Sequence, residues 1–79
     1  MEKERAEKSL RKLKAHLERS AWISDRHPKV FALAEQYAKD AEHFLGKGDC
    51  FSSFGASDYA YGLLDAAWMV EKREFPPPL

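Results

Sequence analysis

The chain has 79 residues, one cysteine and a formal net charge of zero, with 13 Lys/Arg balancing 13 Asp/Glu. This length accommodates one domain, and a single cysteine excludes an internal disulfide and favours a reducing, cytoplasmic compartment. No apolar run approaches the length of a membrane span, so no membrane association is expected. The balanced charge argues against general nucleic-acid binding.

The first predicted helix spans residues 2 to about 22. Apolar side chains repeat along it at spacings of four, three, four and four, namely Ala6, Leu10, Leu13, Leu17 and Ala21. They form one narrow stripe of an α-helix, which is typical of a helix-pairing seam. We therefore predict an interaction surface made of five large apolar residues: Leu10, Leu13, Leu17, Trp22 and Trp68.

A linker, Ser24–Pro28, leads into the second predicted helix, and Pro28 fits its first turn because the missing N–H is not needed there. Apolar residues again recur at three- and four-residue spacings, at Val30, Ala34, Tyr37, Ala41 and Phe44. The helix ends at the turn Gly46–Asp49. A glycine there can adopt the left-handed conformation, and Asp49 can cap the next helix. A connection this short makes the two helices antiparallel neighbours.

The third predicted helix runs from about Cys50 to about Arg73, followed by an extended proline tail over residues 76–79. It is apolar over much of its circumference, as expected of a helix that contacts two neighbours. A glycine inside a helix costs about 1 kcal/mol relative to alanine, so we expect a packing reason at Gly62. The predicted fold is all-α. It is a three-helix antiparallel bundle built on a central helical hairpin, one domain over residues 1–75.

Three motifs of the hairpin resemble the short archaeal helical proteins grouped as domain of unknown function 357. They are Tyr37-x-x-Asp40-Ala41-x-x-Phe44, Gly48-Asp49 and Tyr59-Ala60-x-Gly62-x-Leu64-Asp65-Ala66. The resemblance covers most of the chain from Val30 to Ala67. It implies a small, cytoplasmic three-helix protein from an archaeon, and it implies no activity. More distantly, the hairpin resembles a tetratricopeptide unit and the helical nucleotidyltransferase-associated domains abbreviated HEPN.

Four polar side chains of the hairpin are candidates for a metal or acid–base site: Asp40, His43, Asp58 and Asp65. The last two are seven residues apart and therefore lie close to one helical face. Helical bundles build metal sites from inward-facing carboxylates and histidines. The alternative, which we favour, is that these aspartates are solvated or hydrogen-bond tyrosines, because no Glu-x-x-His pair is present. No metal and no cofactor are expected.

Arg11 and His16 have the R-x4-H spacing of HEPN-type ribonucleases, whose arginine and histidine would act on RNA phosphate and on proton transfer. In that family the motif lies in the later part of the hairpin, whereas here it lies in the charged first helix. Residues 1–20 hold seven Lys/Arg, which could contact phosphates, but four Glu interleave with them. A solvated helix face is therefore the expected arrangement.

Two hypotheses of function follow from these observations. The first is a non-enzymatic helical module that self-associates or docks a protein partner through its first helix. The alternative is an RNA-binding or HEPN-like ribonuclease-type protein that uses the basic first helix, with Arg11 and His16 as its catalytic candidates. The two differ in their partner, which is protein in one case and RNA in the other.

Overall fold

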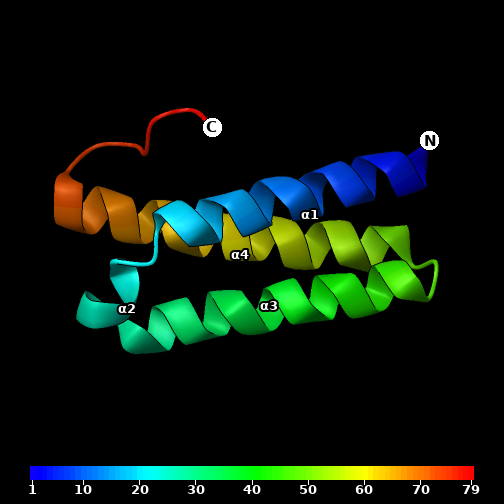
Figure 1. Cartoon of the computed structure of the whole chain (residues 1–79), viewed down its shortest axis with the longest axis horizontal. Coiled ribbons are helices and arrows are strands. Elements are labelled where there is room, and N and C mark those ends of the chain that lie inside the picture. The colour runs from blue at the N-terminus through cyan, green and yellow to red at the C-terminus, as the bar shows by residue number, and fades with distance from the viewer.

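The computed structural model describes all 79 residues and is entirely helical apart from its turns and tail. Figure 1 shows three long helices side by side, α1 (Glu2–Arg19), α3 (Pro28–Gly46) and α4 (Cys50–Lys72). The single turn α2 (Ile23–Arg26) lies at one end of the bundle. α3 and α4 form the antiparallel hairpin, and α1 lies along it with more contact to α4 than to α3. The predicted three-helix bundle is confirmed.

The connection between α1 and α3 differs from the prediction. α1 ends at Arg19 rather than near residue 22, because the chain turns there and the Ser20 backbone N–H bonds the carbonyl of Leu17 at 3.2 Å. The predicted linker overlaps α2, which begins one residue before it at Ile23, and the Ile23 side chain is fully buried. Burial of this one side chain fixes the short helix against the end of the bundle.

The bend between α3 and α4 has the predicted construction. Gly48 has a φ of 80°, in the left-handed region that favours glycine. The Asp49 carboxylate accepts a hydrogen bond of 3.0 Å from the Ser52 backbone N–H and so caps α4. At the other end of α4, Arg73 is left-handed with a φ of 57°, which ends the helix before the prolines.

Alanines are prominent among the buried residues of α3 and α4. They are Ala34, Ala38 and Ala41 on α3, and Ala56, Ala60 and Ala67 on α4, all of them buried. Side chains this small let the two backbones approach closely. Leu10, Leu13, Ile23 and Leu64 supply the larger side chains of the core. No helix is both long enough and apolar enough to cross a membrane.

Two buried serines of α4, one helical turn apart, differ in their hydrogen bonding. Ser53 Oγ donates to the Ala41 carbonyl at 2.9 Å, whereas Ser57 Oγ has no partner. We expect Ser53→Ala to lower the free energy of unfolding by about 1 kcal/mol, because it removes a buried hydrogen bond. Ser57→Ala should leave stability unchanged or raise it, because it removes an unpaired buried hydroxyl. Urea denaturation measures both, and equal losses would contradict this difference.

Candidate functional site

A polar network joins α1 to α4 inside the otherwise apolar bundle. Its centre is His16, which lies on the inner face of α1 one turn after Leu13 and is 0% exposed. The His16 Nε2 atom is 2.8 Å from Oδ1 of Asp65 on α4. The ring of Tyr61, also on α4, packs against the imidazole with ring centroids 4.2 Å apart. His16 is therefore held by α4 through a hydrogen bond and an aromatic contact.

The second ring nitrogen identifies the tautomer of His16. Arg19 Nε donates to His16 Nδ1 at 2.9 Å, and because a guanidinium cannot accept a hydrogen bond, Nδ1 carries no hydrogen. Nε2 therefore carries the hydrogen and donates it to Asp65. Burial lowers the pKa of His16 below its ordinary value of 6.5, outweighing the hydrogen bond to Asp65, and the charge of Arg19 lowers it further. His16 is thus neutral at neutral pH.

The network continues toward the C-terminal end of α4. Trp68 Nε1 donates to Ser20 Oγ at 2.9 Å, and Ser20 Oγ lies 3.3 Å from His16 Nδ1. The Trp68 ring meets the Trp22 ring edge-on, with centroids 5.3 Å apart. The Arg19 guanidinium also donates to the carbonyl of Pro77 in the tail. One set of polar contacts therefore ties together α1, α4 and the C-terminal tail.

The geometry of this network is suited to fixing α1 against α4. A general base needs a lone pair within reach of a substrate proton, and both ring nitrogens of His16 are engaged by protein groups. The ring is also inaccessible, since it has no exposed surface. If Asp65 were removed, the buried Nε2 atom of His16 would be left without its hydrogen-bond partner, which is costly. The network therefore specifies how α4 is rotated toward α1.

Arg11 and His16 do not come together as the R-x4-H spacing suggested. Five residues at 3.6 per turn place them about 140° apart around α1. Arg11 is exposed and makes no hydrogen bond or ion pair, while His16 is buried. The positively charged group that does contact His16 is Arg19, three residues later.

The four candidate polar side chains of the hairpin do not form a cluster. Asp65 bonds His16 on α1, and Asp58 is exposed at the edge of α4 that borders α1. Asp40 bonds a neighbouring side chain of its own helix, and His43 is exposed. Nowhere in the chain do three or more His, Cys, Asp or Glu side chains gather closely enough to hold a metal ion. The alanine face of α4 contacts α3, so its aspartates are turned away from that helix.

The residues predicted to form an interaction surface lie in or against the core of their own chain. Leu10 and Leu13 are buried in the core, and Leu17, Trp22 and Trp68 pack on it as partly buried side chains. The narrow leucine stripe of α1 is thus used within one molecule. The outer side of α1 is highly charged, since nine of its ten exposed residues are charged. RNA binding by this side remains a prediction.

An almost uncharged surface lies on α4, and it does not include Trp68, the residue of this helix that was predicted to form the interaction surface. Eight residues of α4 between positions 51 and 70 are exposed, and only Asp58 among them is charged. They are Phe51, Gly55, Asp58, Tyr59, Gly62, Ala66, Met69 and Val70. We call this set the α4 outer face. Its four large apolar side chains, Phe51, Val70, Tyr59 and Met69, are 88%, 69%, 53% and 44% exposed.

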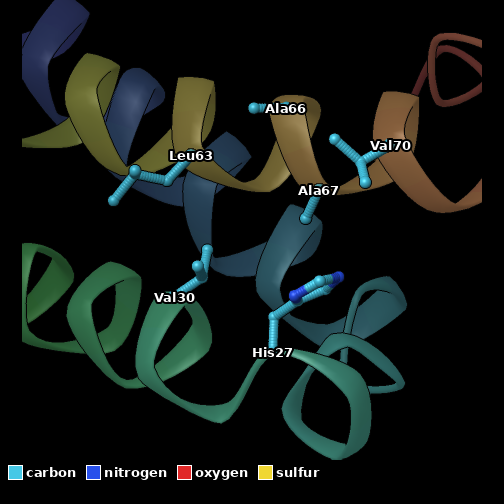
Figure 2. Close-up of a pocket in the computed structure, with 6 residues that line it drawn as sticks. All are labelled: His27, Val30, Leu63, Ala66, Ala67 and Val70. Atoms are coloured by element: carbon cyan, nitrogen blue, oxygen red, sulfur yellow. The ribbon is translucent and has the colours of Figure 1, made fainter.

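An apolar depression of about 180 Å³ borders the α4 outer face where α4 meets the start of α3. It is lined by His27, Val30, Leu63, Ala66, Ala67 and Val70. Figure 2 shows the His27 and Val30 side chains directed from the α3 side toward α4. His27 Nε2 lies 2.7 Å from Glu71 Oε1, and this hydrogen bond lowers the pKa of Glu71. The depression thus has an apolar floor with one polar edge.

The sequence contained a signal for the buried His16 network and another for the α4 outer face. His16 falls three residues after Leu13 on the apolar stripe, so the spacing indicated burial and hence a partner on another helix. The apolar circumference of the third predicted helix was recognised, but it was attributed to two neighbours within the chain. The identity of the His16 partner and the side of α4 left open depend on how the helices are rotated, which residue spacing does not specify.

These features define a small all-α protein: a three-helix bundle with a buried polar network and an uncovered apolar helix face. Residues 3–72 match a family described as "Protein of unknown function (DUF357)", and the chain belongs to this family. The family resemblance of the hairpin motifs is thereby confirmed. No curated protein and no solved structure gives a significant match to the chain.

The lowered pKa of His16 predicts a pH-dependent stability. Below its ordinary pKa of 6.5, the unfolded chain binds more protons than the folded chain, so the free energy of unfolding falls as the pH decreases. The contribution of neutral His16 is complete above that pH. The lowered pKa values of Asp49 and Glu71, ordinarily 3.8 and 4.5, act only at more acidic pH.

We therefore expect His16→Gln to lower stability at neutral pH and to flatten its decline between about pH 6.5 and pH 5. Urea denaturation of both proteins across this range measures the two slopes. Parallel pH profiles for the variant and the wild type would show that His16 is not the group responsible.

Proposed function

We propose that this protein is a non-enzymatic helical interaction module that docks an amphipathic helix of a protein partner on the α4 outer face. The observation that carries the proposal is the near absence of charge on that face. One of its eight exposed residues is charged, compared with nine of the ten exposed residues of α1. Both helices belong to the same small chain, so overall composition does not account for the contrast.

Exposure of this much apolar side chain needs a physical reason. The solvent side of a helix is normally polar, and contiguous exposed apolar patches on small proteins commonly mark interaction sites. Phe51 and Val70, at opposite ends of the α4 outer face, are more than two-thirds exposed at 88% and 69%. Burial of apolar surface is the dominant favourable term in protein association. A partner that covers the face would therefore gain free energy from it.

The shape of the face favours a helix as the docked element. Phe51 to Val70 spans twenty residues of one uninterrupted helix, or about 30 Å. The depression at His27 and Val30 borders one end of the face and can receive a protruding side chain. Helix-in-groove recognition uses apolar anchors at successive turns along such a length. We assign the interaction to α4 rather than to the α1 stripe because Leu10 and Leu13 are already buried.

Site-specific photo-cross-linking tests this function. A photoreactive amino acid is placed at Ala66, within the α4 outer face, or at Ala15, an exposed alanine of α1 that serves as the matched control. Each protein is irradiated in an extract of the source cells, and the adducts are identified by mass spectrometry. We expect protein adducts from position 66 and none from position 15. No adduct at position 66, or equal yields at both positions, would contradict the proposal.

A further inference from the structure

We infer that the helix docked on the α4 outer face is α4 of a second copy of this chain, lying antiparallel to the first. The inference rests on the proposed function, because it names the partner of the same surface. Three observations support it: two glycines without a packing role inside the chain, the order of large and small residues along the face, and the placement of charges.

Gly55 and Gly62 have no packing role within one molecule. A Cβ atom built on either residue would meet no other atom within 4 Å. Glycine inside a helix is destabilising relative to alanine, so the packing reason expected for Gly62 lies outside the chain. Both glycines are on the α4 outer face with Ala66. Residues without a large side chain allow another backbone to approach closely, which is what a second helix on this face would do.

The α4 outer face is complementary to the same face of a second copy whose α4 runs in the opposite direction. With a two-fold axis beside residues 60 and 61, Gly55 lies opposite Ala66 of the second copy, and Tyr59 lies opposite Gly62. Small residues thus face small residues or receive a large one. At the ends, Phe51 lies opposite Val70 of the second copy, so the two most exposed apolar side chains of the face cover each other. A two-fold interface requires such self-complementarity.

The same alignment places charges compatibly. Asp58 comes level with Leu63 of the second copy rather than with the other Asp58. Beyond the face, Asp49 at the N-cap of α4 comes level with Lys72 of the second copy, so residues of opposite sign meet at both ends. Antiparallel helices also place the positive end of one dipole near the negative end of the other. A parallel pair would instead set glycine against glycine and Asp58 against Asp58.

Sedimentation equilibrium of the purified chain tests the identity of the partner. We expect a monomer–dimer equilibrium, with the dimer abolished by Ala66→Glu and retained in Ala15→Glu, which adds the same charge to an exposed alanine of α1. Circular dichroism checks that both variants are folded. A wild-type chain that stays monomeric at all concentrations, or equal dimerisation of the two variants, would overturn the inference.

The glycine contact has its own test in Gly62→Ala, with Gly46→Ala as the control. Neither added Cβ meets another atom within one chain, so both variants should be at least as stable as the wild type in dilute solution. In the proposed dimer the methyl group at position 62 overpacks the contact and should weaken dimerisation about tenfold or more. Equal dimerisation of the Gly62 and Gly46 variants would overturn the close approach of the two α4 helices at Gly62.

Cysteine pairing tests the direction of the helices. In a Cys50→Ser background, Phe51→Cys and Val70→Cys are prepared as separate proteins and oxidised alone or mixed. Antiparallel packing predicts a disulfide-linked dimer only in the mixture, because residue 51 meets residue 70 and neither meets itself. Self-linked dimers of each protein alone would show parallel packing and overturn the inference.

These experiments separate the inference from the function on which it rests. A monomeric wild type that gives adducts with a different protein at position 66 would overturn the second copy as partner and leave the interaction module standing. A monomer without any adduct at that position would overturn both. Adducts made of two copies of this chain would support both.

Discussion

The structure depends on one constraint: α4 is apolar around more of its circumference than a single chain of this size covers. Its alanine side packs against α3, where Ala56, Ala60 and Ala67 allow close contact. A second side meets α1 through Tyr61, Asp65 and other polar or aromatic residues. The third side is largely uncovered, and Tyr59 at its edge packs against Tyr37 of α3 with ring centroids 4.7 Å apart. The proposed role as an interaction module accounts for the apolar character of this third side.

The buried polar network decides which residues are on that third side. Because Asp65 bonds His16 and Trp68 bonds Ser20, α4 cannot rotate about its axis without losing hydrogen bonds inside the core. Ala66 follows Asp65 in the chain. Successive residues of an α-helix point about 100° apart around its axis. Ala66 is therefore exposed on the outer face, and the network that joins α1 to α4 also sets the composition of the surface.

Local rules were sufficient for the elements of the fold. Pro28 and Asp49 marked the two helix starts through their backbone chemistry, and the bend at Gly48 followed from its freedom to adopt a positive φ. The short helix α2 was missed because it depends on burial of Ile23 by distant residues. A narrow leucine stripe looks the same whether its partner is in the same chain or another one, and for α1 the partner proved to be internal. The grouping of the four polar candidates failed because helix rotation is a tertiary property.

The concentration dependence of the four glycine amide signals in a proton–nitrogen correlation spectrum tests most directly whether the uncovered side of α4 is an interface. Two glycines, Gly55 and Gly62, lie on the α4 outer face, and two, Gly46 and Gly48, lie at the bend. If the uncovered side of α4 is an interface between copies, the first two signals shift or broaden as the protein is concentrated, and they do so more than the bend signals. Signals at Gly55 and Gly62 that do not change with concentration would contradict it.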